Sequence, residues 1–505
     1  MTIRTGAEYL AGLRDGREVW LAGRRVDDVL AEPVLAAAAH TVARLYDQHH
    51  DPLLREVLTY QDGAERHPLS LAAPRDARDL RRRGAAFRAT AETTFGLLGR
   101  SPDFVNTAVT AFASAAPFFD KADPRFGRNV TAYHAACLAG DPFLSHTAIN
   151  PPLSRARSSH EQDDPDVHLR IVRETSEGVV VRGAKLIGTL VPVADEIVVF
   201  PLPGYRPGDE AYTVAFAIPV ATPGLRIVCR EPLVADPSRL VSTPLAPYEE
   251  IDATCVFDDV LVPWDRVFFH GDVDAANRLY DATTARHHTG QHGIIRGAVK
   301  AELLAGIAIS LAEMSGTNSF LHVKEMLGEV LGALELARAG ILAAEADAEV
   351  SEWGTLTPAI APVLALRYHF PRMTSRMIEV IQLLGGGSLL STPSEEDMRS
   401  ELWPGIERYF RGANGVDAQQ RVRMLKLAWD ATGSAFGQRQ MQYERYHSGD
   451  PVRLAAAQYA GYDTDPLLRT VQRALHPEQP GVDASARATP VDAPGDGHSS
   501  GKAHS

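Results

Sequence analysis

The sequence predicts an α+β protein in which a helical region, a β-rich region and a second helical region follow one another. Three observations carry this prediction: residues 29–114 are rich in Ala, Leu and Arg, β-branched runs gather in residues 168–269, and helical periodicity returns after residue 274. The expected parts are an N-terminal helical domain at 1–145, a central β-domain at 146–275 and a C-terminal helical bundle at 276–475.

The N-terminal region is expected to be helical because its apolar residues recur at helical spacing. Val34–Ala38, followed by Val42 and Leu45, favours a helix, and few strand signals interrupt the region.

In the middle region, short runs of β-branched residues replace the helical pattern. Val179–Val181, Ile197–Phe200 and Val214–Ile218 are separated by Gly, Pro and Asp, which typically terminate strands. We expect a compact β-domain here. Because strands do not alternate with helices, the pattern argues against a Rossmann fold and its nicotinamide site.

The C-terminal region returns to helical spacing over long stretches. One apolar stripe is formed by Val323, Leu327, Val330, Leu334, Ala337 and Ile341. Together with Ile294–Leu311 and Met373–Leu384, it predicts a bundle of long helices that can be shared between subunits. Residues 476–505 have no apolar anchors and are expected to form a disordered tail.

Composition excludes several classes of function. The chain has 505 residues, 45% of them hydrophobic, and a formal net charge of −13, which argues against a nucleic-acid surface. The N-terminus has no signal-peptide pattern and no long apolar window follows, so we expect a cytoplasmic protein without a membrane segment. The three cysteines, Cys137, Cys229 and Cys255, are widely spaced, so we predict buried thiols and no metal site.

Four features could carry chemistry, and each also has a structural interpretation. The Gly385-Gly386-Gly387 run follows an apolar helix, so it is either a helix end or a place where backbone amides approach a phosphate or flavin. His146 precedes Asn150-Pro151-Pro152 at the entry to the β-domain, and His292 begins a predicted helix. Arg100 precedes a Ser-Pro-Asp helix start and could equally be a surface arginine. Residue chemistry alone leaves these alternatives open.

Several segments, in order along the chain, resemble the oxygenase component of 4-hydroxyphenylacetate 3-monooxygenase. They are RTGAEYLAGLRDGREVWLAGRRVDDV, LGRSPDF, SHTAINPPLSR, VRGAKLIGTLVPVADEIVVFP, AFAIPVATPGL, VFDDVLVPWDRVF, IQLLGGGSLLSTPSEED and YERYHSGDP. The resemblance spans residues 4–470. It implies an acyl-CoA dehydrogenase-like fold, which agrees with the order of helical and β-rich regions predicted above.

The resemblance also implies an activity, a cofactor and partners. Such a protein binds FAD in its reduced form, FADH2, made by a separate NAD(P)H-dependent flavin reductase. O2 then gives a C4a-hydroperoxyflavin, which hydroxylates a phenolic small molecule ortho to its hydroxyl group. Members of the family form homo-oligomers, commonly tetramers.

Site residues are carried over by motif. Arg100 and His146 match positions that line the flavin and phenol site, and His292 is similar to a histidine that acts as the phenol base in relatives that hydroxylate halophenols. The residues implied for flavin binding are His146, Asn150, Pro151, Arg155, Thr189, Gly385, Gly386, Gly387, Phe436, Gly437, Gln438 and Arg439. The glycine run would approach FAD from a neighbouring subunit.

The chain departs from the family pattern at the substrate site. Phe104 stands where the hydroxyphenylacetate enzymes typically have tyrosine, so one hydrogen-bond donor to the phenol is lost. Leu202 and Pro203 replace the small polar pair expected in the loop after Phe200. Arg100, Phe104, His146, Leu202 and Pro203 are therefore the expected substrate contacts, and the substrate is 4-hydroxyphenylacetate-like, tyrosine-derived, carrier-tethered or a halophenol.

Other readings remain at this point. The same flavin chemistry could N-hydroxylate an amine, and a homologue could keep the flavin without catalysis. A 4-hydroxybutyryl-CoA dehydratase would need cysteines for an iron–sulfur cluster where this chain has Arg100 and Phe104. An acyl-CoA dehydrogenase would purify yellow with tightly bound FAD.

Overall fold

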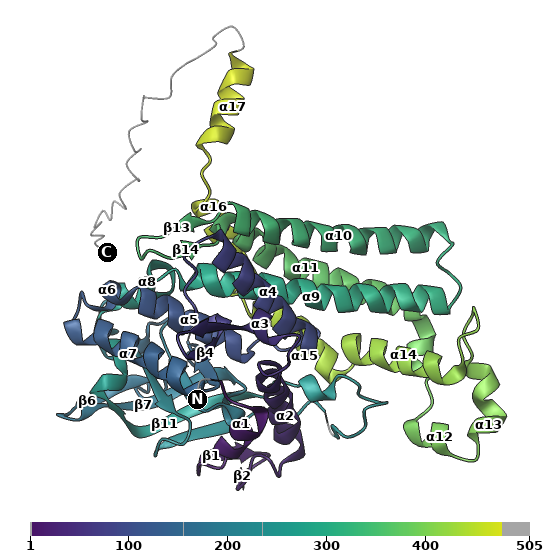
Figure 1. The fold of residues 1–505 in the computed structure, drawn as a ribbon, viewed down its shortest axis with the longest axis horizontal. Helices are drawn as coiled ribbons and strands as arrows, with labels where there is room; N and C mark the ends of the chain where they lie inside the picture. Colours follow the sequence, from purple (N-terminus) through teal and green to yellow (C-terminus); the bar gives the residue numbers. More distant parts are fainter. Residues whose placement is uncertain (1–2, 155, 235, 477–505) are drawn as a thin grey trace, which may run out of the picture. The chain divides into compact units, whose positions relative to one another are not determined.

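The computed structural model describes residues 3–154, 156–234 and 236–476. The described residues divide into two units, one up to residue 458 and one from residue 459 onward. In the first unit, helical segments flank a β-rich middle in the predicted order (Figure 1). The predicted domain boundaries near residues 145 and 275 stay predictions, and the expected disordered tail lies outside the described residues, apart from His476.

The N-terminal part is mainly helical, as predicted. Its helices are α1 (Gly6–Gly12), α2 (Pro33–Gln48), α3 (Arg55–Leu58), α4 (Ala77–Thr93), α5 (Pro102–Ser114), α6 (Ala116–Phe119) and α7 (Pro124–Gly140). The structure adds two hairpins that the sequence analysis missed, β1 (Glu18–Leu21) with β2 (Arg24–Val26) and β3 (Thr59–Asp62) with β4 (Glu65–Pro68). These strands are three or four residues long, too short to establish an alternating pattern.

The β-rich middle contains two sheets. The six-stranded sheet has the order β2-β1-β10-β11-β7-β6 and the four-stranded sheet the order β12-β9-β8-β5. The bounds are β5 (Leu144–Thr147), β6 (Arg170–Glu174), β7 (Gly178–Thr189), β8 (Glu196–Val199), β9 (Val214–Pro219), β10 (Leu225–Cys229), β11 (Asp252–Pro263) and β12 (Val267–His270). The three predicted β-branched runs are β7, β8 and β9. The rings of Phe216 on β9 and Phe257 on β11 meet edge to face at 6.0 Å and join the two sheets.

The C-terminal part of the first unit is a bundle in which α9, α10 and α11 run side by side (Figure 1). The helices are α8 (Val273–Ala282), α9 (Ala285–Met314), α10 (Leu321–Ala346), α11 (Ile360–Gly385), α12 (Glu395–Arg399), α13 (Trp403–Ile406), α14 (Ala418–Thr432), α15 (Ala435–Tyr446) and α16 (Pro451–Ala460). A short hairpin, β13 (Glu349–Val350) with β14 (Leu356–Thr357), joins α10 to α11. The predicted stripe lies on α10, where Val323, Val330 and Leu334 are buried. The second unit contributes α17 (Asp465–Leu475).

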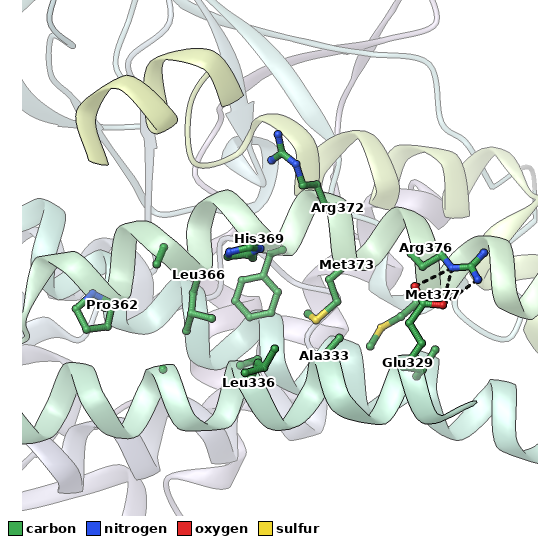
Figure 2. A pocket seen from close by; sticks show the side chains of 15 residues that line it. Glu329, Ala333, Leu336, Pro362, Leu366, His369, Arg372, Met373, Arg376 and Met377 are labelled. Atoms are coloured by element: carbon green, nitrogen blue, oxygen red, sulfur yellow. Dashed lines mark hydrogen bonds and ion pairs between the residues drawn. The ribbon is translucent and has the colours of Figure 1, made fainter. Parts of the chain in front are cut away.

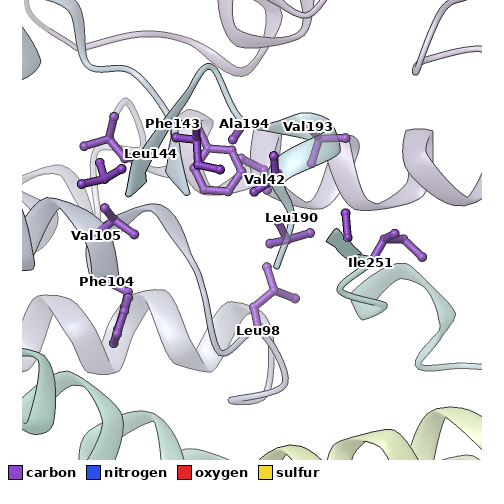
Figure 3. Packing of buried hydrophobic residues seen from close by; sticks show 14 of the residues in the cluster. Val42, Leu98, Phe104, Val105, Phe143, Leu144, Leu190, Val193, Ala194 and Ile251 are labelled. Carbon is purple, nitrogen blue, oxygen red and sulfur yellow. The ribbon is translucent and has the colours of Figure 1, made fainter. Parts of the chain in front are cut away.

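One continuous core connects the helical and β-rich parts of the first unit. Figure 3 shows Val105 of α5 directed toward Leu144 and Phe143 beside β5, whereas Phe104 points away from them. The three cysteines are buried and free, as predicted. None of the helices in the described residues combines the length and the apolar composition that a membrane span requires. The same residues contain no cluster of side chains suited to hold a metal ion.

Asp141 follows α7 in a left-handed backbone conformation (φ 45°) and is buried. Burial raises the pKa of its carboxyl from 3.8 to about 7, although the backbone N–H of Arg4 donates to it at 3.1 Å. The proton held by the folded protein therefore stabilises it fully below pH 3.8, and this contribution is lost as the pH rises to about 7.

We expect Asp141→Asn to stabilise the protein at neutral and alkaline pH, because the amide cannot ionise and asparagine tolerates this backbone conformation. Urea unfolding at about pH 8 should show a free energy of unfolding raised by up to about 4 kcal/mol, with little change near pH 4. Equal shifts at both pH values would contradict this account.

Candidate functional site

Arg100 and Phe104 lie at the start of α5, where Ser101-Pro102 begins the helix. The guanidinium carbon of Arg100 is 4.2 Å from the centroid of the Phe104 ring. Its Nη1 donates to the hydroxyl of Tyr443 at 2.6 Å, and its backbone N–H donates to Glu250 Oε1 at 2.8 Å. Within the described part of the chain, no carboxylate reaches ion-pair distance of this guanidinium. Arg100 is therefore fixed in position by its neighbours, and its positive charge can interact with a ligand.

His146 lies on β5 between two aromatic rings. Its ring centroid is 5.4 Å from that of Phe104 and 5.5 Å from that of Phe200, which is parallel to it within 8°. Its Nδ1 is buried and has no hydrogen-bond partner among the described residues. Burial, with the charge of Arg100, lowers the pKa of His146 to about 3. The imidazole is therefore neutral at neutral pH.

His292 comes from α9 and reaches the same ring. Its ring meets Phe104 at 5.4 Å and Phe87 of α4 at 5.1 Å, both edge to face. Its Nε2 is 3.2 Å from Asp103 Oδ1, and its buried Nδ1 has no partner in the described residues. The structure thus gathers Arg100, His146 and His292, the three predicted catalytic residues, around Phe104.

A pair of carboxylates, the buried Glu250 and the partly buried Asp252, links two predicted flavin contacts to this cluster. Thr189 Oγ1 donates to Asp252 Oδ1 at 2.8 Å, and Arg439 Nη2 donates to the same oxygen at 2.9 Å. Arg439 Nη1 also donates to Glu250 Oε2 at 2.8 Å, while Glu250 Oε1 accepts from Arg100. Thr189, Arg439 and Arg100, which are far apart in sequence, therefore share one network.

The predicted segment Phe436–Arg439 lies in α15, the helix that also carries Tyr443. Phe436 and Gly437 are buried, and Gln438 Nε2 donates to the Thr432 carbonyl at 2.7 Å. The segment is thus held firmly against the end of α14.

Asn150 and Pro151 follow β5 and lie against β7. Lys185 Nζ donates to Asn150 Oδ1 at 2.6 Å, and the Pro151 carbonyl lies 2.9 Å from His168 Nε2. Burial lowers the pKa of Lys185 to about 7. Arg155, predicted to contact flavin, lies outside the described residues.

Family comparisons decide the relationship of the chain. Residues 5–269 match the model described as 4-hydroxyphenylacetate 3-hydroxylase N terminal, and residues 276–476 match the corresponding C-terminal model. The chain belongs to the 4-hydroxyphenylacetate 3-hydroxylase family. The family assignment confirms the resemblance of the sequence motifs.

Relatives match over most of their length. The oxygenase component of 4-hydroxyphenylacetate 3-monooxygenase from Thermus thermophilus is 38% identical, covering 94% of this chain and 97% of the relative. The oxygenase component of 4-nitrophenol 2-monooxygenase from a Rhodococcus species is 34% identical, covering 88% and 86%. A crystal structure of a 4-hydroxyphenylacetate 3-monooxygenase oxygenase component with FAD and 4-hydroxyphenylacetate aligns with TM-score 0.90 at 38% identity, covering 94% and 98%. An archaeal 4-hydroxybutyryl-CoA dehydratase, 21% identical with TM-score 0.85, shares the fold.

The glycine run ends α11 at Gly385, as its structural interpretation expected. Gly386 has φ 48° and ψ −144°, a conformation that disfavours any side chain. That the glycine run approaches a flavin bound in a neighbouring subunit stays a prediction.

The loop after β8 contains the predicted substrate contacts Leu202 and Pro203. Leu202 is partly buried against the core. Asn277 of α8 fixes the loop, because its Oδ1 accepts the backbone N–H groups of Gly204 at 2.7 Å and Tyr205 at 3.0 Å. The position of the loop is thus set by α8.

Sequence analysis missed the residues that hold the predicted ones in place. Asp103 stands inside the GRSPDF motif and Lys185 inside the RGAKLIGT motif, so both could have been proposed from the sequence. Glu250 and Asp252 precede and begin β11, and Tyr443 lies far along the chain in α15. Only the fold shows that these three contact Arg100 or Arg439.

Proposed function

We propose that this chain is the oxygenase component of a two-component, FAD-dependent monooxygenase that hydroxylates a phenol at the carbon next to its hydroxyl group. The observation that carries the proposal is the cluster of Arg100, His146 and His292 around Phe104. Two buried histidine nitrogens there have no partner among the described residues. Unpaired polar atoms beside a cation suit an aromatic ligand that changes from phenol to phenolate.

The residues have distinct roles in this proposal. Arg100 stabilises negative charge on the phenol oxygen, neutral His146 hydrogen-bonds the ligand, and His292 accepts the phenol proton. The rings of Phe104 and Phe200 exclude water from the reacting groups. Reduced FAD, when bound, supplies the oxygen-transfer chemistry with O2, and a separate NAD(P)H-dependent reductase provides it.

The flavin contacts are proposed from the geometry and the family. Thr189 and Arg439 meet at Asp252, so both can face one ligand while the carboxylates fix their side chains. The full proposed set is His146, Asn150, Pro151, Arg155, Thr189, Phe436, Gly437, Gln438 and Arg439, with Gly385, Gly386 and Gly387 from a second subunit.

The substrate is proposed to be a phenol with a tail unlike that of 4-hydroxyphenylacetate. Phe104 has no hydroxyl to donate to the phenol, and the guanidinium of Arg100 covers its ring. Leu202 and Pro203 offer apolar contacts instead of hydrogen bonds to an acidic tail. Related proteins act on 4-nitrophenol or on a carrier-bound chlorohydroxyphenyl group, as their names state.

The protein is proposed to be a homo-oligomer, with a tetramer as the expected form. An apolar groove of about 490 Å³ lies between α10 and α11. Figure 2 shows Leu336 and Ala333 of α10 facing Leu366 and Met373 of α11 across it. Leu336 is 73% exposed in the single chain, and covering such a surface with a second copy removes apolar area from water.

Leu336→Glu is expected to shift the protein toward smaller species, because a carboxylate in the covered groove would lose its hydration. Light scattering coupled to size-exclusion chromatography measures the change. Leu321→Glu is the matched control, since Leu321 is 84% exposed but begins α10 outside the groove. An unchanged mass for Leu336→Glu would contradict the proposed interface.

The activity is tested by mixing the full chain with FAD, a flavin reductase, NADH and a phenol panel in air. The panel contains 4-hydroxyphenylacetate, a chlorophenol, 4-nitrophenol and tyramine. We expect a product with one added oxygen on the ring of at least one phenol, measured by mass spectrometry, with little H2O2. Oxygenation of the tyramine nitrogen would instead support an N-hydroxylase. Flavin binding without any product would indicate a non-catalytic homologue.

A further inference from the structure

Asp103 is a buried carboxylate for which the roles above give no function. It lies in the first turn of α5 and is 8% exposed. Its Oδ1 accepts from Ser101 Oγ at 2.5 Å and lies 3.2 Å from His292 Nε2. Its Oδ2 is buried and has no partner in the described part of the chain. Burial of this kind disfavours the charged form of a carboxyl group unless a neighbouring group stabilises it.

The contact with His292 provides this stabilisation. Burial opposes ionisation, but His292 and the Ser101 hydroxyl hold the pKa of Asp103 below its ordinary value. An ionised carboxylate can only accept, so His292 donates to it from Nε2, and the tautomer with its proton on Nε2 is the one that this contact selects. The lone pair is then on Nδ1, the buried atom that has no partner among the described residues.

The ring of His292 is also fixed in direction. Phe87 and Phe104 meet it edge to face from α4 and α5. A side chain held by two rings and one carboxylate cannot turn to exchange its nitrogens without breaking the Asp103 contact. Nδ1 thus stays the nitrogen without a partner among the described residues, on a ring that contacts Phe104.

Other charged groups around His292 are engaged elsewhere. Arg83 of α4 contacts His288 Nδ1 at 2.7 Å, one turn before His292 on α9, and Gln291 Oε1 at 3.1 Å, on the residue that precedes His292. Arg296 of α9, one turn after His292, pairs with Glu444 at 2.7 Å. Within the described residues, Asp103 is the carboxylate in ion-pair contact with His292.

We propose that Asp103 is a positioning residue that presents His292 Nδ1 to the phenol and stabilises the imidazolium formed when the phenol is deprotonated. The inference rests on the proposed function. In the step, the phenol O–H bond breaks, an N–H bond forms at Nδ1, and the electron pair stays on the phenolate oxygen. Arg100 faces that negative charge, and no oxidant or reductant is consumed.

The ionisation of bound 4-nitrophenol tests this directly, because its phenolate and phenol forms absorb at different wavelengths. The full chain is titrated with 4-nitrophenol against a reference containing oxidised FAD, at a fixed pH near neutrality. We expect the wild type to bind the phenolate form. In Asp103→Asn the phenolate-to-phenol ratio of the bound ligand should fall about tenfold or more, and the dissociation constant for total ligand should rise only by the loss of the phenolate-bound form.

Matched variants separate positioning from general damage. His292→Gln should reproduce the spectral shift, and combining it with Asp103→Asn should add little, since both act through one nitrogen. Asp103→Glu should restore part of the phenolate signal. Asp141→Asn removes another buried carboxyl group, one that contacts Arg4, and should leave the spectrum unchanged.

Turnover provides the second measurement. For a phenol that is un-ionised at the assay pH, Asp103→Asn should lower kcat about 100-fold with little change in KM. For 4-nitrophenol at alkaline pH, where the proton is already lost, the defect should largely disappear. A normal phenolate signal in Asp103→Asn, or an equal kcat defect for both substrates, overturns the inference. If the wild type binds and hydroxylates no phenol, the proposed function fails, and the inference fails with it.

Discussion

Arg100→Met is expected to lower kcat/KM for phenol hydroxylation by about 10²–10³-fold, the effect typical of losing one preorganised charge-stabilising donor. Arg100 is the cation in contact with Phe104, and its Nη1 is held at 2.6 Å by the Tyr443 hydroxyl. Methionine retains the contact with the ring but not the charge. The transition state would then lose stabilisation of the developing phenolate, while binding of the neutral ring is kept.

The same substitution should also disturb His146. The charge of Arg100 contributes, after burial, to the low pKa of His146. Without that charge His146 gains a proton more readily, so the acid limb of the pH–activity profile should move to higher pH in Arg100→Met.

Two further variants make the Arg100 prediction specific. Arg100→Lys keeps the charge but not the planar group and should recover part of the activity. Arg125→Met removes a guanidinium that stacks 4.9 Å from Trp264, away from the site, and should leave kinetics unchanged. If Arg100→Met keeps kcat/KM within about threefold of the wild type, Arg100 does not stabilise the reacting charge.

Glu444→Gln is expected to destabilise the protein by about 3–5 kcal/mol, because it leaves two buried cations without their carboxylate. Glu444 of α15 is 1% exposed, accepts from Arg296 at 2.7 and 3.0 Å, and accepts from Lys300 Nζ at 3.1 Å. Both partners lie on α9, so the cluster fixes α15 against the helix that carries His292. Chemical unfolding monitored by circular dichroism measures the loss.

The pH dependence of this cluster has a defined sign. Burial would raise the pKa of Glu444, but the charges of Arg296 and Lys300 hold it far below its ordinary 4.5. The carboxylate therefore stabilises the wild type above pH 4.5, and the contribution is lost as the pH falls below that value. The difference between wild type and Glu444→Gln should thus narrow in acid.

Glu396→Gln is the matched control for Glu444→Gln. Glu396 also pairs with an arginine, Arg239 at 2.7 Å, but is 69% exposed, so its loss should leave the free energy of unfolding nearly unchanged. Equal destabilisation by the two variants would show that the buried cluster has no special role.

Sequence periodicity predicted the long elements of the fold well. The apolar stripe of α10 extends over several turns, and the β-branched runs of β7, β8 and β9 are bounded by turn-forming residues. The pairs β1–β2 and β3–β4 escaped prediction because strands of three or four residues cannot display a period, and these strands lack the β-branched run that marks the equally short β8. Pairing with neighbouring strands stabilises them. In particular, β1 pairs in parallel with β10, which lies some 200 residues away in sequence.

By itself the sequence determined the order of helical and β-rich regions, the family and the identities of Arg100, His146 and His292, because helix and strand periods and long motifs are local properties of the chain. The tertiary structure alone decided that α5, β5 and α9 bring these residues to one ring, that Asp103 contacts His292 and Glu250 contacts Arg100, and that Glu444 joins α15 to α9 through Arg296 and Lys300. Such contacts join residues about 150 or more positions apart. The electrostatic interactions between these groups are strong because burial removes water from around them, and burial is a property of the packed fold.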